Sequence, residues 1–401
     1  MKRTHVQVGG PLGPYAPSFV KALEEQGYGY RAACDHLYLM AQLSRWLEHR
    51  GLAVPQLTPE LGEEFVAERR RTAPSKKMSA RRLEPLAGHL VRLGVLPSWE
   101  RAPDGSPTGE LLSRYSHYLL EERGLPRANL RHYVDVARSF LASLPGDGQL
   151  DLGELSPAHV NAFVLGESRR SKTGSAKSMT TRLRALLRYL YVEGLVPEAL
   201  TGAVPSVAHW RLASLPKALG PRQVARLLES CDRRSCAGRR DFAIITVLWR
   251  LGLRAGEVAR LSLDDVDWAA GEVVIKGKGR REDRLPLPVD VGEAIVAWLQ
   301  RGRPASGCRE VFLRVRAPIV ALSASGVSAV VGQACRRAGV PLCGAHRLRH
   351  TAATELLRAG GSLAEVGQVL RHEESATTSL YAKVDRRALE AVVRPWPGEA
   401  R

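Results

Sequence analysis

Residues 346–353 read HRLRHTAA, and this stretch does most to decide how the chain is interpreted. His346 and Arg349 are three residues apart, so a helix would place them on one face. A histidine nitrogen accepts or donates a proton near neutral pH, and a guanidinium offers a fork of N–H donors that matches a phosphate. The segment therefore predicts a helix with a cationic face, and His350 is interpreted as a packed, structural residue.

Two earlier segments carry further cationic side chains. Residues 251–258 read LGLRAGEV, which predicts that a hydrophobic helix ends in glycine and that a new helix opens with Arg254. Glu257, one turn later, could orient that arginine. A hairpin is then predicted from a strand at 273–275 and a return at 284–287, with Lys278 between two glycines at its tip. Taken alone, Lys278 fits a solvated basic turn as well as a phosphate site.

Residues 370–381 read LRHEESATTSLY and contain a histidine, His372, nine residues before Tyr381. A tyrosine hydroxyl, with a pKa of about 10, is a poor nucleophile unless cations stabilise its oxyanion and the phosphate that it attacks. A tyrosine late in a helix more often belongs to a core. With the cationic residues above, however, Tyr381 suits phosphoryl transfer without a metal. We find no cluster of acidic residues of the two-metal type, and Asp264 and Asp265 look structural.

Together these segments resemble the tyrosine recombinases, a family of phage integrases, Xer-type resolvases and transposon integrases. The resemblance runs from about residue 218 to residue 385. The residues that carry it are Arg254, Lys278, His346, Arg349, His372 and Tyr381. A small departure is Arg371, at a position where the family often has glycine before the histidine.

The resemblance implies a role for each of these residues. The two arginines would clamp the scissile phosphate, and Tyr381 would attack it to leave a 3′-phosphotyrosyl link. Lys278 would protonate the departing 5′ oxygen, His346 would act as base or bind the phosphate, and His372 would donate a further hydrogen bond. A 5′-hydroxyl of the partner duplex would then attack, and two exchanges would form and resolve a Holliday junction. The family needs no metal, ATP or other cofactor, and it works as a homo-tetramer on two DNA sites.

The composition fits a nucleic-acid partner. Lysine and arginine number 59 against 41 aspartate and glutamate, for a formal net charge of +18. Such a balance favours double-stranded DNA, although a merely arginine-rich protein would share it. The six cysteines form no C-x-x-C pair, which favours free thiols and a cytoplasmic location. We find no apolar run of membrane-spanning length and expect no membrane partner.

The residues before the catalytic region contain an apparent duplication. Two four-helix units are predicted, at roughly 15–100 and 109–200, and similar words recur in them at offsets of 97 to 100 residues. Residues 23–27 match 120–124, residues 57–59 match 155–157, and residues 83–97 match 183–197. In the first unit a helix is predicted to start with Thr58 as its cap and Pro59 at its first position, and another helix is predicted at 79–93 and ended by Gly94. Helices are also predicted at 221–231 and 239–252. Amphipathic helices can also resemble each other by chance, but the repeated order favours duplication.

The predicted fold is mainly α, with a small antiparallel β-sheet in the catalytic domain and two all-α, SAM-like units before it. The predicted domains are a flexible N-terminus 1–14, an extra helical unit 15–100, a core-binding unit 109–205, a catalytic domain 218–394 and a tail 395–401. The resemblance implies that the core-binding unit grips DNA. Candidate DNA contacts in it and at the hairpin tip are Arg169, Arg170, Lys172, Lys177, Arg182, Arg184, Arg188, Arg280 and Arg281.

Several functions stay open at this point. A mobile-element integrase or transposase fits best. An Xer-like chromosome or plasmid dimer resolvase ranks second, because a chain with a single helical unit would suit that role better than one with two. A relaxing type IB topoisomerase would share the chemistry. A DNA-binding accessory protein without catalysis is the alternative of another class, and the complete residue set argues against it. Sibling recombinases or accessory proteins are conceivable partners. A helix at 386–394 could pack in its own subunit or on a neighbour.

Overall fold

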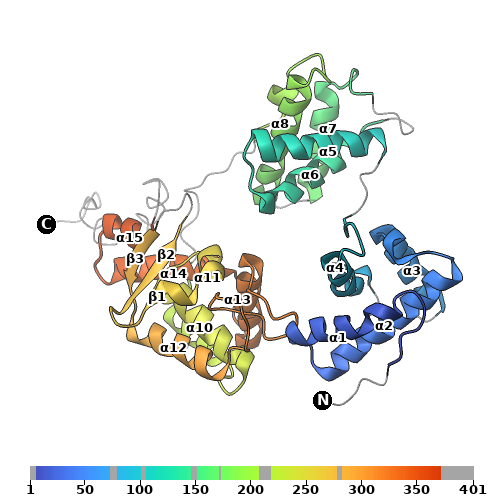
Figure 1. Cartoon of the computed structure of the whole chain (residues 1–401). Coiled ribbons are helices and arrows are strands. Elements are labelled where there is room, and N and C mark those ends of the chain that lie inside the picture. The colour runs from blue at the N-terminus through green and yellow to red at the C-terminus, as the bar shows by residue number, and fades with distance from the viewer. Residues whose placement is uncertain are drawn as a thin grey trace. The chain divides into compact units, whose positions relative to one another are not determined.

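The computed structural model describes residues 6–72, 79–100, 105–145, 151–170, 173–206, 218–277 and 282–371. Contacts divide the chain into two units, one of residues 1–99 with 212–401 and one of residues 100–211 (Figure 1). Helices dominate, and the described residues form one three-stranded antiparallel sheet of order β1-β2-β3. The predicted fold class is therefore confirmed. None of the helices in these ranges combines the length and apolar character needed to cross a membrane.

The first four helices enclose a core of their own. Their bounds are α1 Ala16–Glu25, α2 Tyr30–His49, α3 Pro59–Thr72 and α4 Glu84–Arg92. Helix α3 begins as its sequence predicts, since the Thr58 hydroxyl accepts from the Leu61 amide and Pro59 occupies the first helical position. The helix predicted at 79–93 begins as a 3-10 turn, Ala80–Leu83, and is α-helical only from Glu84.

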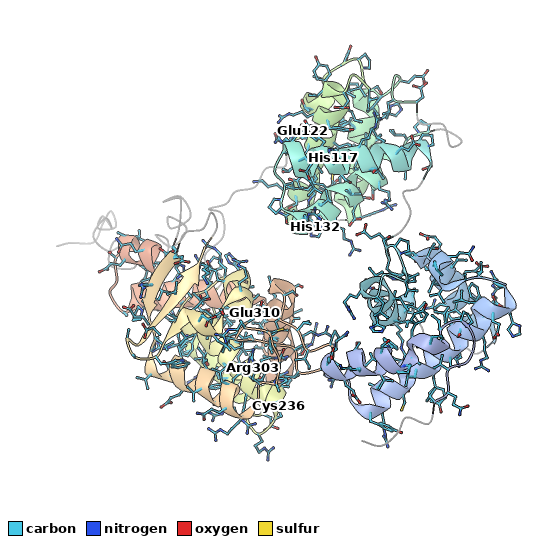
Figure 2. All side chains as sticks on the ribbon, viewed as in Figure 1. His117, Glu122, His132, Cys236, Arg303 and Glu310 are labelled. Atoms are coloured by element: carbon cyan, nitrogen blue, oxygen red, sulfur yellow. The ribbon has the colours of Figure 1, made fainter. Side chains whose placement is uncertain are left out.

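The second unit repeats this order of helices around a separate core. Its elements are α5 Pro107–His117, a π-helical segment Tyr118–Glu122, α6 Arg127–Leu141, α7 Pro157–Arg170 and α8 Thr173–Val192. Helices α5 and α6 carry His117 and His132 at positions that Figure 2 labels. Tyr115, Phe140 and Leu183 are fully buried at the centre of the unit.

The two sets of helices also end alike. Gly27 and Gly124 have φ values of +80° and +58°, and Gly94 and Gly194 have values of +71° and +67°. These positions are 97 and 100 residues apart in the sequence. Glycine ends a helix in this left-handed conformation without a steric penalty. The shared order and shared helix ends support the predicted duplication.

The remaining described residues pack around a third core, apart from a small cluster of Ala353, Leu357, Val366 and Leu370. Their helices are α9 Pro221–Glu229, α10 Cys236–Arg250, α11 Ala255–Arg260, α12 Val289–Arg301, α13 Ala324–Ala338, α14 Ala345–Arg358 and α15 Leu363–Val369. The strands are β1 Val266–Asp267, β2 Glu272–Lys276 and β3 Glu282–Pro286. Helices predicted at 221–231 and 239–252 correspond to α9 and α10, with ends that differ by two or three residues. Val273 and Ile275 of β2 face the core, as the two-residue period of a strand requires.

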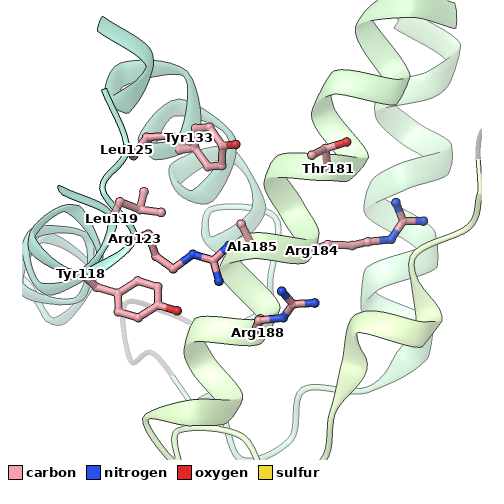
Figure 3. A pocket seen from close by; sticks show the side chains of 9 residues that line it. All are labelled: Tyr118, Leu119, Arg123, Leu125, Tyr133, Thr181, Arg184, Ala185 and Arg188. Atoms are coloured by element: carbon pink, nitrogen blue, oxygen red, sulfur yellow. The ribbon is translucent and has the colours of Figure 1, made fainter. Parts of the chain in front are cut away.

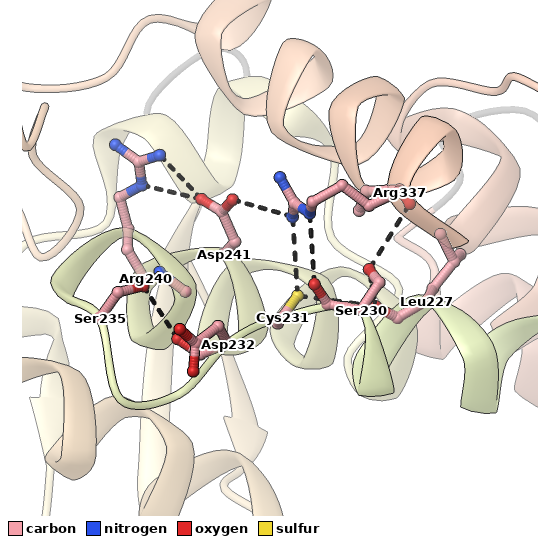
Figure 4. Close-up of polar contacts among 10 residues, drawn as sticks. Leu227, Ser230, Cys231, Asp232, Ser235, Arg240, Asp241 and Arg337 are labelled. Carbon is pink, nitrogen blue, oxygen red and sulfur yellow. Dashed lines mark hydrogen bonds and ion pairs between the residues drawn. The ribbon is translucent and has the colours of Figure 1, made fainter. Parts of the chain in front are cut away.

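The buried Asp241 carboxylate helps to fix two helices of this region to each other. The Asp241 carboxylate on α10 accepts from Arg240 at 2.7 Å and from Arg337 of α13 at 3.1 Å (Figure 4). Arg337 also donates to the Ser230 carbonyl just after α9. Beyond α12, Arg303 donates to the Glu310 carbonyl at 2.9 Å, and Figure 2 labels both residues. These contacts hold the body of the region on which the candidate site is built.

Candidate active site

Arg254 stands at the N-cap of α11, just after the end of α10. Its backbone N–H donates to Glu257 Oε2 at 2.8 Å, and its Nη1 donates to Glu257 Oε1 at 2.7 Å. The Glu257 side chain is 2% exposed, whereas that of Arg254 is 45% exposed. Glu257 therefore orients Arg254 from the protein side and leaves its guanidinium open to solvent.

Arg349 on α14 is almost completely buried, with 2% of its surface exposed. Its Nη1 donates to the Gly252 carbonyl at 2.6 Å, and its Nη2 donates to the Leu370 carbonyl. Gly252 has a φ of +59°, and a Cβ at this position would meet the Leu370 side chain at 2.6 Å. The glycine therefore lets the turn before α11 approach both the end of α15 and the guanidinium of Arg349.

Arg371 is the second partner of the Glu257 carboxylate. Its Nη2 donates to Glu257 Oε2 at 2.9 Å, and its side chain is 5% exposed. The Arg371 carbonyl accepts in turn from Arg254 Nη2 at 3.2 Å. Burial alone would raise the pKa of Glu257, but the Arg254 amide and the charges of Arg371 and Arg254 outweigh burial and lower that pKa. The carboxylate is therefore held ionised between two guanidiniums.

His346 and His350 lie one turn apart on α14, with ring centroids 4.3 Å from each other. Desolvation, together with the charges of Arg349 and Arg254, lowers the pKa of His346, although part of this residue stays exposed. Desolvation and the neighbouring His346 lower the pKa of His350 to about 4. Both rings are therefore neutral near pH 7, a state in which one nitrogen accepts a hydrogen bond or a proton.

The β-hairpin leads toward the predicted lysine. Lys276 ends β2 and pairs with Asp265 at 2.6 Å, while Asp264 pairs with Arg309. The two acidic residues thus hold basic side chains, and no group of acidic, histidine or cysteine ligands that could hold a metal occurs in the described ranges. Six of the predicted residues lie outside the described residues. They are Lys278, Arg280 and Arg281 at the hairpin tip, His372 and Tyr381 after α15, and Lys172 between α7 and α8. The predicted helix at 386–394 also lies outside the described residues.

The second unit contains a cationic cleft of about 310 Å³ between the π-helical segment, α6 and α8. Tyr118, Arg123, Tyr133, Arg184 and Arg188 contribute its polar and aromatic lining (Figure 3). Arg123 reaches from the segment after α5 toward α8. Sequence reasoning missed Arg123 and the two tyrosines, because no local pattern shows that they lie opposite the basic face of α8.

Of the predicted DNA contacts in this unit, Arg184 and Arg188 line the cleft, whereas Arg169, Arg170, Lys177 and Arg182 do not. Arg169 and Arg170 are exposed at the end of α7, Lys177 is exposed on α8, and Arg182 is half-buried on α8. Arg184 donates to the Val204 carbonyl at 2.9 Å, so it also secures the chain that leaves the unit.

Known proteins of one family resemble this chain. The sequence profile described as "Phage integrase family" matches residues 217–387. The chain is 39% identical over 395 residues to a protein of Sinorhizobium fredii that is named provisionally as the integrase/recombinase y4rA, and the match covers 98% of this chain and 96% of that protein. It is 30% identical to the tyrosine recombinase XerD of Mycobacterium tuberculosis, over 72% of this chain and 96% of that protein.

Among solved structures, a lambda integrase tetramer bound to a Holliday junction matches with a TM-score of 0.54 at 17% identity. The match covers 81% of this chain and 90% of that chain. At this level of identity the match shows a similar fold and nothing more. The y4rA match, by contrast, runs through both four-helix units and through the region that contains Arg254, Arg349 and Arg371.

Proposed function

The chain belongs to the phage integrase family of tyrosine recombinases, and on that premise we propose that it cleaves and rejoins DNA through a covalent bond to Tyr381. The observation that supports this most is the convergence of Arg254, Glu257, His346 and Arg349 from two helices that are far apart in the sequence. Cationic donors placed in advance around a phosphate stabilise the charge that develops during phosphoryl transfer.

The proposed reaction conserves phosphodiester bonds. The Tyr381 oxygen attacks phosphorus, the bond from phosphorus to the 5′ oxygen breaks, and Lys278 gives its proton to that oxygen. His346 is neutral near pH 7 and can accept the tyrosine proton. The 5′-hydroxyl of a partner strand then attacks the phosphotyrosine and releases Tyr381. Because each bond broken is replaced by one formed, the reaction needs no ATP, and we propose that it needs no metal.

The two arginines differ in how they would meet the phosphate. Arg254 presents a half-exposed guanidinium. Arg349 is buried, and its Nη1 and Nη2 each donate to a carbonyl. Each of these nitrogens carries two hydrogens, so contact with a backbone carbonyl and donation to a phosphate are compatible. His372 would add a further donor.

We propose that the cleft of the second unit contacts the DNA backbone, and that the enzyme acts as a homo-tetramer on two duplexes. Arg123, Arg184 and Arg188 supply positive charge there, and Tyr118 and Tyr133 supply hydroxyl donors. Arg169, Arg170, Lys172, Lys177 and Arg182, with Arg280 and Arg281 of the hairpin tip, are proposed as further contacts.

We propose the role of a mobile-element integrase. The y4rA match extends over nearly the whole chain, whereas the XerD match covers 72% of it. An Xer-like dimer resolvase is the second candidate, since XerD is a relative at 30% identity. Plasmids with two copies of the selected site separate these roles. Integration between separate molecules supports the first role, strict resolution within one molecule supports the second, and relaxation without exchange would contradict both.

The covalent step can be tested without knowing the target site. A pool of nicked duplexes with randomised sequence traps any strand that becomes linked to the protein, because the short fragment beyond the nick diffuses away. We expect the wild-type chain to form adducts in EDTA without ATP, and Tyr381→Phe to form none. Equal behaviour of the two proteins would contradict the proposed chemistry.

A further inference from the structure

Arg371 is the sole non-glycine residue with positive φ in the ranges that the structure describes, with a φ of +54°. Such a conformation is uncommon for a residue with a Cβ. It follows Leu370, the C-cap residue of α15, and precedes His372. Its guanidinium points into the protein, where the side chain is 5% exposed and pairs with Glu257. A long cationic side chain is thus buried at a turn where glycine would meet the backbone requirement.

This turn anchors both catalytic arginines. The Leu370 carbonyl accepts from Arg349, and the next carbonyl along, that of Arg371, accepts from Arg254 at 3.2 Å. Successive carbonyls therefore hold the two guanidiniums that would clamp one phosphate. The left-handed conformation at residue 371 sets the relative directions of these carbonyls, so the turn determines how Arg254 and Arg349 are spaced.

The Arg371 side chain also changes the net charge of the group around Glu257. Glu257 and Arg254 alone form a neutral pair, in which the carboxylate offsets the charge that Arg254 would present to a phosphate. With Arg371 on Glu257 Oε2 at 2.9 Å, the group of three carries one net positive charge. That charge lies toward solvent, because Arg254 is 45% exposed while Glu257 and Arg371 are buried.

We propose that Arg371 is a positioning residue for phosphate cleavage. It holds the turn that anchors Arg254 and Arg349, and it neutralises Glu257 so that Arg254 keeps its positive charge for the scissile phosphate. This role rests on the proposed function, since it concerns the same reaction. Arg371 acts through Glu257 and the two carbonyls, and it does not touch the DNA.

The test compares Arg371→Gly with Arg371→Lys in adduct formation on nicked duplexes selected with the wild-type enzyme. Glycine keeps the left-handed backbone and removes the guanidinium. We expect the single-turnover rate of Arg371→Gly to fall by about 10-fold to 100-fold, as is typical when a residue that orients a functional group is lost. DNA affinity, measured in the Tyr381→Phe background, should change far less. Lysine should restore part of the rate because it restores the charge.

A second comparison asks whether Arg371 works through Glu257. In a Glu257→Gln background, Arg371→Gly should cause little further loss, because the carboxylate that it neutralises is gone. Arg337→Ala is the matched control. It removes one of two guanidiniums from the buried Asp241 carboxylate in the same region (Figure 4) and should lower thermal stability without lowering the rate of cleavage.

The outcomes separate the two proposals. A folded Arg371→Gly variant that cleaves at the wild-type rate would overturn the role of Arg371 and leave the proposed function standing. If Arg371→Gly lowers the cleavage rate equally with Glu257 intact and in the Glu257→Gln background, then Arg371 does not act through that carboxylate. If the wild-type chain itself forms no adduct, the proposed function fails, and this role fails with it.

Discussion

Arg254 and Arg349 carry the same charge in different surroundings. Arg254 faces solvent and is oriented by a buried carboxylate, whereas Arg349 is buried and is oriented by two backbone carbonyls. A lysine could replace the charge of either residue but could not make two directed contacts from a fixed plane. The pair therefore combines one accessible cation with one that is rigidly held.

At this scale the histidines of α14 predict a dependence on pH. His350 has a folded-state pKa of about 4 against an ordinary value of 6.5, so the unfolded chain binds its proton first as the pH falls. The stability due to neutral His350 is present above about pH 6.5 and is lost progressively between pH 6.5 and 4. We expect the thermal midpoint to fall between pH 7 and pH 5, and to fall less in His350→Gln. If the thermal midpoints of the wild type and of His350→Gln fall equally with pH, His350 is not the source of this pH dependence.

At the scale of elements, the sequence predicted where many helices begin and end. Pro59 and Pro157 begin α3 and α7, and Gly94 and Gly194 follow α4 and α8 with positive φ. These signals are local, because proline fixes the first turn and glycine tolerates the left-handed cap. The strand predicted at 273–275 lies within β2.

Contacts between distant segments could not be predicted in the same way. The Arg349 guanidinium joins Gly252, 97 residues earlier, to Leu370, 21 residues later. Nothing in either segment signals the other. Arg371 looked like a small departure from a family pattern, and its contact with Glu257 appears only once α11 and α15 are brought together. The resemblance predicted which residues are catalytic, and the fold showed how two of them, Arg254 and Arg349, are held.

The turn at Gly252 gives a prediction for these elements. Gly252→Ala introduces a Cβ at a φ of +59° that would meet Leu370 at 2.6 Å, beside the carbonyl that anchors Arg349. The matched control is Gly271→Ala, whose φ is +66° but whose Cβ would meet nothing within 4 Å. Both should lose about 1–3 kcal/mol of stability from backbone strain. Only Gly252→Ala should lose more stability than this and also slow adduct formation. Equal effects of the two substitutions on stability and on rate would contradict the role of Gly252 in placing the carbonyls that hold Arg349.

At the scale of the whole molecule, the two four-helix units differ in charge at corresponding positions. The offsets of the repeat relate Arg123, Arg184 and Arg188 of the cleft to Gln26, Glu84 and Gly88 of the first unit. Under the proposed duplication, the second unit carries guanidiniums at these three positions and the first unit does not. The first unit therefore offers no equivalent phosphate contacts at these positions.

This difference predicts the salt dependence of DNA binding. Each lost phosphate contact should reduce the slope of log affinity against log salt by about 1. The double variant Arg123→Ala, Arg188→Ala should therefore bind DNA more weakly and with a shallower slope. Arg131→Ala is the control, because Arg131 is exposed on α6 and pairs with Asp135 outside the cleft. An unchanged slope in the double variant would remove the cleft from the DNA interface.

In the proposed reaction, the chain joins itself to DNA through Tyr381. The most direct measurement is to trap the adduct on a nicked duplex, digest both protein and DNA, and locate the nucleotide-bearing peptide by mass spectrometry. We expect a 3′-phosphonucleotide on Tyr381, formed without metal or ATP. A nucleotide on any other side chain, or attachment through a 5′-phosphate, would contradict it.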